Sequence, residues 1–277
     1  MIKILSKILK KILPENYYRR VKIIYDYLIN FKSRNYILAN DLKYNEELFR
    51  KLRFDIEVIK AEISKLNYLY NDQNLSWHYH LFVGLQKYFS HKKIKILEIG
   101  TLTGQFTNFI SKVYKDSEVT TIDLDDADKT FTSTYGRDQK ENLTKFLDQR
   151  KNNLDNKNIK FIKLNSINIK KFFSGKKFDL IWIDGDHLNP QITIDIINSL
   201  DLLDTNGIIC VDDIIMDLQY KKNKYVSNEG FLTLNHLENN DVIKNYYLIK
   251  RINRRNFYDK KYISISVFSD NKNFYEF

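Results

Sequence analysis

The chain has 277 residues, of which 43% are apolar, and it carries 45 basic against 35 acidic side chains, for a net charge of +10. This length and apolar content fit a folded protein with a sizeable core and exclude a disordered chain. The single cysteine, Cys210, excludes a disulfide scaffold and a cysteine-rich zinc module, and it favours a reducing compartment.

The first segment is basic and amphipathic. Four apolar residues share one face of a helix that ends near Pro14, namely Ile2, Leu5, Leu9 and Ile12. Residues 1–40 hold a net charge of +7, which leaves +3 for residues 41–277. The helix over residues 1–14 could lie on an anionic membrane surface, or it could cover an apolar patch of this chain or of a second copy. A third interpretation is a compositional bias towards lysine, with no partner at all.

Residues 1–75 contain no glycine and a single proline, and their apolar residues recur at helical spacing, so we expect an N-terminal helical region. A seam with alternating spacings of three and four runs through Phe49, Leu52, Ile56, Ile59, Ile63, Leu66 and Tyr70. Such a seam predicts packing against a neighbouring helix of the same chain or against a second copy, which would make a homo-oligomer.

The segment Trp77-His-Tyr-His80 precedes the first predicted strand. Its aromatic residues predict a helix that packs on the following domain, and one of the two histidines could reach an active site. Because the two histidines would lie on different helix faces, they do not favour a metal-binding pair.

From about residue 90, short apolar runs alternate with helical stretches, a pattern typical of βαβ units and a parallel sheet. Five runs predict strands at residues 94–99, 118–123, 160–164, 178–184 and 208–212. Two further runs, 246–252 and 262–268, are joined by a connection too short for a helical crossover, so we expect them to pair antiparallel. The predicted fold class is therefore α/β, with a seven-stranded sheet over residues 76–277.

The first predicted strand runs into a glycine turn, Glu98-Ile-Gly-Thr-Leu-Thr-Gly104. Glycines at the carboxyl end of a strand let the backbone approach a nucleotide-like ligand. The turn is not a dinucleotide fingerprint, because Leu102 and Gln105 stand where that motif needs glycine, and no Gly-Lys-Ser/Thr follows as in a P-loop. Asp123 ends the second predicted strand, where an acid can accept hydrogen bonds from ribose hydroxyls.

The segment from Glu98 to Gly104, taken with Asp123, resembles the class I S-adenosylmethionine (SAM)-dependent methyltransferases, particularly the O-methyltransferases related to catechol and caffeoyl-CoA methyltransferases. The resemblance implies a Rossmann-like, doubly wound sheet with an antiparallel terminal pair, and SAM as cofactor. The cofactor residues it implies are Glu98, Gly100, Thr101 and Gly104 for the methionine part, Asp123 for the ribose, and Asn165 and Ser166 for the adenine.

Acidic residues follow the fourth and fifth predicted strands. Asp184, Asp186 and His187 come after the fourth, and Asp212 and Asp213 end the fifth. The carboxyl ends of parallel strands share one edge of a sheet, so these carboxylates should converge, and they would repel one another unless a cation neutralised them. Oxygen ligands of this kind suit Mg²⁺ or a similar ion. Taken singly, each aspartate is equally typical of a helix cap or a turn.

The metal-dependent small-molecule O-methyltransferases that this sequence resembles hold their ion with acids at these places, which implies Asp184, Asp212 and Asp213 as Mg²⁺ ligands. His187 stands three positions after the first of them, where macrolide-sugar O-methyltransferases have a histidine. The run Ile-Asp-Gly-Asp-His is similar to a bacterial family linked to sugar and natural-product modification. His187 is then expected to be the general base, since imidazole titrates near neutral pH.

The sequence therefore predicts a cytoplasmic, divalent-metal-dependent O-methyltransferase that uses SAM to methylate a hydroxyl of a sugar, glycolipid or secondary metabolite. One alternative is a metal-independent N- or O-methyltransferase acting on a small molecule. The other is a module that binds a membrane surface, at the inner membrane face, or a nucleic acid. No nucleic-acid partner is expected, because the chain has no aromatic-basic RNA motif and its bulk is nearly neutral.

Overall fold

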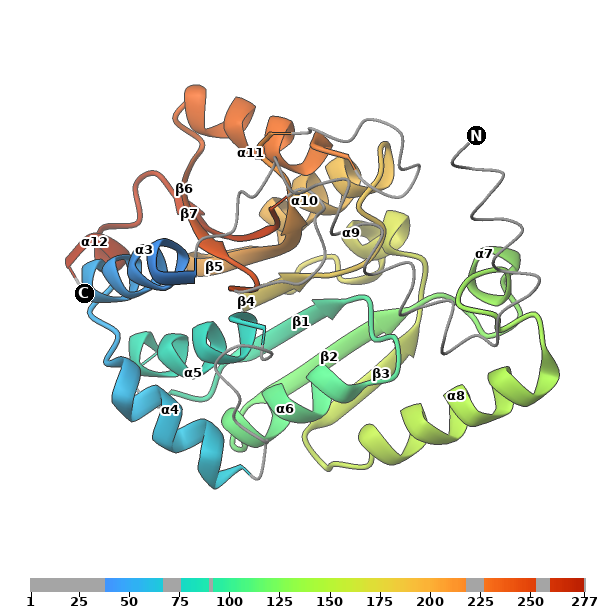
Figure 1. Cartoon of the computed structure of the whole chain (residues 1–277). Coiled ribbons are helices and arrows are strands. Elements are labelled where there is room, and N and C mark those ends of the chain that lie inside the picture. Colours follow the sequence, from blue (N-terminus) through green and yellow to red (C-terminus); the bar gives the residue numbers. More distant parts are fainter. Residues whose placement is uncertain (1–37, 67–75, 90–91, 218–226, 253–259, 277) are drawn as a thin grey trace, which may run out of the picture.

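The computed structural model describes residues 38–66, 76–89, 92–217, 227–252 and 260–276 (Figure 1). The amphipathic helix expected over residues 1–14 lies outside these ranges, so its membrane contact stays a prediction. Within the described ranges, no helix has the length and the apolar character needed to cross a membrane.

Seven strands form one mixed sheet in the order β3-β2-β1-β4-β5-β7-β6. The strands are β1 (Lys95–Ile99), β2 (Glu118–Asp123), β3 (Ile159–Lys163), β4 (Phe178–Ile183), β5 (Leu203–Ile214), β6 (Ile243–Ile249) and β7 (Tyr262–Phe268). The first five run parallel, whereas β7 pairs antiparallel with both β5 and β6. This is the predicted Rossmann-like, doubly wound sheet with its antiparallel terminal pair.

Helices cover both faces of the sheet (Figure 1). The N-terminal group is α3 (Leu38–Lys51), α4 (Ile56–Lys65), α5 (His78–Tyr88) and α6 (Gln105–Val113). The remaining helical elements are α7 (Lys129–Thr132), α8 (Lys140–Asn153), η1 (Ser166–Asn168), α9 (Ile169–Phe172), α10 (Gln191–Leu202), α11 (Glu229–Asn239) and α12 (Lys272–Glu276). Side chains alternate along a strand, so Leu180 and Trp182 join the core under α3 to α6, while Ile181 and Ile183 join the core under α9 to α11.

The predicted helix seam is divided between two helices. Arg53 has a left-handed backbone with φ 54°, and the Asp55 side chain caps the start of α4 by accepting from the backbone N–H groups of Glu57 and Val58. The seam residues buried in the same core as the sheet are Phe49, Leu52, Ile59 and Ile63. The seam is thus used inside the chain, and the homo-oligomer expected from it stays a prediction.

Candidate active site

The glycine turn joins β1 to α6 at the carboxyl edge of the sheet. Gly100 has φ +102°, and a Cβ there would overlap the carbonyl oxygen of Asp184 at the end of β4. Gly104 has φ +71°, and a Cβ there would lie 2.8 Å from Cδ2 of Leu154. Both positions need glycine for the backbone angle and for space. The turn therefore packs its backbone directly against the end of β4.

A series of hydrogen-bonded polar side chains supports this turn from the interior of the fold. Glu98 is only 1% exposed, and its Oε2 accepts hydrogen bonds from the hydroxyls of Thr107 and Thr121, the latter at 2.6 Å. The hydroxyls of Thr101 and Thr121 lie 2.6 Å apart, and because Thr121 already donates its proton to Glu98, Thr101 is the donor of this hydrogen bond. Burial raises the pKa of Glu98 to about 7, against the opposing effect of the threonine hydrogen bonds. The side chains of Glu98 and Thr101 thus hold the turn from inside.

Asp123 ends β2 beside the turn. Its Oδ2 accepts from the backbone N–H of Leu102 at 2.8 Å, and its Oδ1 accepts from the N–H of Leu124 at 2.8 Å. Burial raises the pKa of Asp123, while these two hydrogen bonds oppose the rise. A carboxylate can accept about four hydrogen bonds, so capacity for two ribose hydroxyls remains. The carboxylate is fixed in orientation, as a ribose-binding acid has to be.

The two residues expected near the adenine follow β3. The Asn165 side chain accepts from the N–H of Ile167 at 3.1 Å and so begins η1. The Ser166 hydroxyl accepts from Nε2 of Gln191 at 2.7 Å, and the same amide donates to Oδ1 of Asp195 at 2.7 Å. Burial raises the pKa of Asp195 to about 6. Asp195 could not be found from the sequence, because a single polar residue inside a helix is not a motif. The contact of Asn165 and Ser166 with adenine stays a prediction.

The acidic side chains after β4 and β5 come together as the strand order predicted. Asp184 lies against Asp212, and burial together with this neighbour raises the pKa of Asp184 well above its usual range. Nε2 of His187 lies 3.6 Å from Oδ1 of Asp184 and 3.9 Å from Oδ2 of Asp213. Asp186 does not join them, because it is exposed and accepts from the backbone N–H of Leu188 at 3.0 Å, as a turn former does.

A β-bulge lets two consecutive aspartates face one side. Val211 pairs with Ser264 and Ile214 with Tyr262, so Asp212 and Asp213 together oppose one residue of β7. Asp213 has φ 53°, in the left-handed region. In a regular strand these neighbours would point to opposite faces. The bulge instead brings both carboxylates to a single partner.

That partner is an ammonium group from the β6–β7 connection. Nζ of Lys250 lies 2.7 Å from Oδ1 of Asp213 and is also hydrogen-bonded to Oδ2 of Asp212. Lys261 donates to the other oxygen of Asp213. Burial alone would lower the pKa of Lys250, but Asp212 and Asp213 outweigh it and raise the pKa. The sequence predicted Mg²⁺ or a similar divalent ion as the neutralising cation, whereas in the structure two lysines supply positive charge there.

The three predicted metal ligands do not fit a divalent ion in this arrangement. Both oxygens of Asp213 and Oδ2 of Asp212 already accept from ammonium groups, whose charge would repel a metal bound to the same atoms. Within the part of the chain that the structure describes, no group of three or more His, Cys, Asp and Glu side chains is arranged as a metal site.

Two histidines stand at this cluster in their neutral form. Burial lowers the pKa of His187, although Asp213 and Asp212 oppose the change. Burial also lowers the pKa of His78, on α5, to about 3, against the opposing charge of Asp212. The backbone carbonyl of His187 accepts from the Ser227 hydroxyl at 2.8 Å, which ties the loop after β4 to the start of α11. A neutral imidazole at this edge can accept a proton.

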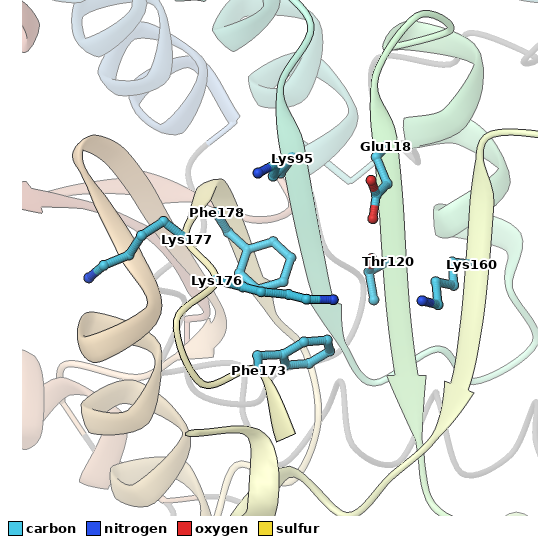
Figure 2. Close-up of a pocket in the computed structure, with 8 residues that line it drawn as sticks. All are labelled: Lys95, Glu118, Thr120, Lys160, Phe173, Lys176, Lys177 and Phe178. Atoms are coloured by element: carbon cyan, nitrogen blue, oxygen red, sulfur yellow. The ribbon is translucent and has the colours of Figure 1, made fainter. Parts of the chain in front are cut away.

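A separate hollow lies at the amino ends of β1 and β2, on the opposite edge of the sheet (Figure 2). Its lining residues are Lys95, Glu118, Thr120, Lys160, Phe173, Lys176, Lys177 and Phe178. It contains none of the residues predicted from the motifs, and Lys177 there already donates to the backbone carbonyls of Asp201 and Leu203. The hollow is therefore separate from the predicted site residues, which lie at the carboxyl ends of the strands.

Residues 97–214 match the model of a protein family described as a methyltransferase domain. No curated protein sequence is significantly similar to the chain. Among solved structures, an O-methyltransferase from Bacillus cereus in complex with SAH (S-adenosylhomocysteine) is 15% identical, with 83% of this chain and 100% of that chain covered and a TM-score of 0.48.

Two further structural neighbours are equally distant. TomG from Streptomyces achromogenes, an O-methyltransferase involved in tomaymycin synthesis and bound to SAM, is 13% identical, with 82% and 98% of the two chains covered and a TM-score of 0.47. The fibrillarin pre-rRNA processing protein of Methanococcus jannaschii is 14% identical, with 64% and 67% covered and a TM-score of 0.45.

Proposed function

We propose that this chain, in which residues 97–214 match the model of a methyltransferase domain, is a class I SAM-dependent methyltransferase and methylates a hydroxyl oxygen of a small molecule. The acceptor that we propose is a sugar, a glycolipid or a secondary metabolite with a free hydroxyl. The observation that carries the proposal is the position of the neutral His187 beside buried carboxylates, at the same sheet edge as the glycine turn and Asp123.

The residues of the turn are suited to hold SAM. Gly100 and Gly104 keep the backbone free of side chains where β1 meets α6, and the oriented Asp123 carboxylate has capacity left for ribose hydroxyls. When bound, SAM supplies an electrophilic methyl group on a sulfonium. The chain's own residues then have to place a hydroxyl oxygen against that methyl group and remove its proton.

His187 is the proposed proton acceptor. Its pKa is lowered, so the imidazole is neutral at neutral pH and can take the hydroxyl proton as the oxygen forms its bond to carbon. The Asp213 carboxylate lies 3.9 Å from Nε2, where it can stabilise the imidazolium that results, whereas the raised pKa of Asp184 favours the neutral form of that group. His187→Ala should therefore lower kcat while leaving SAH affinity unchanged.

Of the two enzyme alternatives predicted from the sequence, the ion pairs favour the metal-independent one. The carboxylate oxygens that would hold Mg²⁺ are engaged by Lys250 and Lys261. No step proposed here uses a metal ion. The acidic cluster instead borders the base and the acceptor site.

Thermal unfolding with SAM, S-adenosylhomocysteine (SAH) and NAD, each in EDTA, tests the cofactor part. A ligand at about 100 times its Kd stabilises the folded state by about 2.7 kcal/mol. We expect SAM and SAH to raise the melting temperature and NAD to leave it unchanged. Asp123→Ala is the control variant, and it should remove most of the rise. A rise with NAD alone would contradict the proposal.

Transfer of a labelled methyl group from SAM to a panel of sugars, glycolipids and phenolic metabolites tests the acceptor part. Label should appear in an ether linkage to a hydroxyl oxygen, and His187→Ala should lower the rate by about 10²–10⁴-fold, the usual contribution of a general base. Label found on nitrogen, or a rate that does not depend on His187, would contradict the proposed chemistry.

A further inference from the structure

The acidic cluster at the ends of β4 and β5 contains its own cations. The side chains of Lys250 and Lys261 are only 14% and 21% exposed, and both ammonium groups contact the Asp213 carboxylate. Lys250 also contacts Asp212, whose side chain is 1% exposed. Ion pairs on the surface are mobile and contribute little, whereas a buried charge is stable only when it is paired. These contacts are therefore part of the folded core at this edge.

The backbone of Lys250 is anchored from several sides. Its N–H donates to the carbonyl of Lys261 at 3.0 Å, and its own carbonyl accepts from the N–H of Trp77 at 2.8 Å and from the Ser76 hydroxyl at 3.2 Å. The preceding residue, Ile249, exchanges two hydrogen bonds with the Asn45 side chain of α3. The ammonium group is thus presented by a fixed backbone and not by a free surface chain.

The bulge in β5 is matched to this ammonium group. Without it, the Asp212 and Asp213 side chains would leave opposite faces of the strand, and one ammonium group could not contact both. The left-handed conformation of Asp213 is unfavourable for a residue with a side chain, so it persists only where other contacts compensate. The contacts of Lys250 and Lys261 with the Asp213 carboxylate compensate for this unfavourable conformation.

We propose that Lys250, assisted by Lys261, is the resident cation of the acidic cluster and takes the place that a divalent metal would have there. Lys250 is a positioning residue: it holds Asp212 and Asp213 in place, and Asp213 in turn lies beside His187. The effect of Lys250 on turnover rests on the proposed methyltransferase function. Its effect on metal binding does not, because that effect follows from the ion pairs alone.

The test is Mn²⁺ binding, measured by electron paramagnetic resonance on the full chain with SAH present. Mn²⁺ prefers oxygen ligands, as Mg²⁺ does, and its free form gives a signal that binding removes. We expect wild type to bind no Mn²⁺ up to 1 mM. Lys250→Met leaves the carboxylates without their main counterion, and we expect it to bind Mn²⁺ at least ten times more tightly than wild type. Lys250→Arg keeps the charge and should behave as wild type.

Lys145→Met is the matched control. Lys145 pairs with Glu141 on the exposed surface of α8, so its removal frees a carboxylate outside the cluster and should leave Mn²⁺ binding unchanged. Two results would overturn the proposal: half-saturation of wild type below 1 mM, or equal affinities in wild type and Lys250→Met. If Lys250→Met does not fold, wild type decides alone, since a melting temperature raised by 1 mM Mn²⁺ overturns the proposal and an unchanged one supports it.

A titration with SAH of the same samples separates this proposal from the proposed function. If SAH does not bind, the cofactor assignment fails, while the Mn²⁺ comparison still decides the role of Lys250. If SAH binds equally to wild type and Lys250→Arg and no Mn²⁺ binds to either, both proposals stand. A merely structural role for Lys250 would lower stability without creating affinity for Mn²⁺.

Discussion

The two halves of the sheet's carboxyl edge satisfy their buried polar groups in different ways. On the β1–β2 side, Asp123 accepts from backbone N–H groups and Glu98 accepts from threonine hydroxyls. On the β4–β5 side, Asp212 and Asp213 are held by the ammonium groups of lysines from the β6–β7 connection. The first half binds its carboxylates through neutral donors, with Arg150 and Arg137 acting on Asp123 only as nearby charges, whereas the second half binds them through ammonium groups.

This difference assigns the two halves different tasks. Neutral donors orient Asp123, and the nearby charges of Arg150 and Arg137 favour its ionised form without a direct ion pair to it, so it can still accept from a ligand. Ammonium groups cancel the charge of Asp212 and Asp213, which allows the carboxylates to stay buried beside His187. One half is thus suited to hold a cofactor, and the other is suited to position a base. Substitutions that act on one half only can separate these tasks.

The largest expected effect comes from Lys250→Met. Removing one partner of a buried ion pair leaves an uncompensated charge, which typically costs about 3–5 kcal/mol of folding free energy. Urea unfolding should detect this loss, and Lys145→Met should produce no measurable change because its pair is exposed. Equal stabilities for the two variants would show that the lysine-held half does not depend on its charges.

Gly100→Ala should have the next largest effect, on the other half. A Cβ at this position overlaps the Asp184 carbonyl oxygen, and φ +102° is itself unfavourable for alanine. We expect a loss of roughly 2–4 kcal/mol in unfolding free energy together with a loss of SAH binding in calorimetry.

Gly175→Ala separates the two causes of that loss. Gly175 has φ +76° and nothing within 4 Å of its added Cβ, so it reports the backbone cost alone, about 1 kcal/mol. SAH affinity should be unchanged in this variant. If both alanine variants lost the same free energy, the close packing of the turn against β4 would have no energetic role.

Glu98→Gln tests the polar support beneath the turn through pH. Burial raises the pKa of Glu98 to about 7, so the folded state holds the proton more tightly than the unfolded chain does. The stability that this provides is fully present below the ordinary pKa of glutamate and is lost as pH rises through about 7, a change of roughly 3 kcal/mol. Unfolding between pH 5 and pH 8 should show this slope in wild type and a smaller one in Glu98→Gln. A wild-type slope of the opposite sign would contradict the buried, protonated state.

Asp186→Asn should have the smallest effect. Asp186 is exposed and caps a turn through Leu188, and asparagine can accept the same hydrogen bond. We expect stability to change by less than about 0.5 kcal/mol, as is usual for surface substitutions, and turnover to stay as in wild type. Asp184→Asn, two residues earlier, is the contrast, since that side chain lies in the cluster beside His187. A strong loss of turnover in Asp186→Asn would place it at the reaction.

The sequence predicted the parts of this molecule that depend on local order. The glycine turn is formed by consecutive residues, and the strands are recognised by short apolar runs. Accordingly, β2 and β7 have the predicted bounds, and the parallel strand order brings Asp184 close to Asp212. The burial of Glu98 was not predictable, because it depends on hydroxyls at Thr107 and Thr121 in other elements.

The lysine partners were missed for a related reason. Lys250 and Lys261 are separated from Asp213 by 37 and 48 residues, and in a chain with 45 basic residues no spacing marks them out. Their position follows from the antiparallel return of β7 and from the bulge at Asp213, neither of which has a sequence motif here. The interruption of the helix seam was missed for a similar reason. Arg53, in a left-handed conformation, lies between α3 and α4, and seam residues on both sides of it still pack in one core.

The central claim is that the cofactor binds without a metal ion, because lysines neutralise the acidic cluster. A calorimetric titration of SAH into chelator-treated wild-type protein tests this claim most directly. We predict saturable binding of one SAH per chain in EDTA, with an affinity that 1 mM Mg²⁺ leaves unchanged. Absence of binding in EDTA with recovery in Mg²⁺ would contradict the lysine-balanced site. Absence of binding under both conditions would contradict the assignment of the glycine turn and Asp123 to SAM.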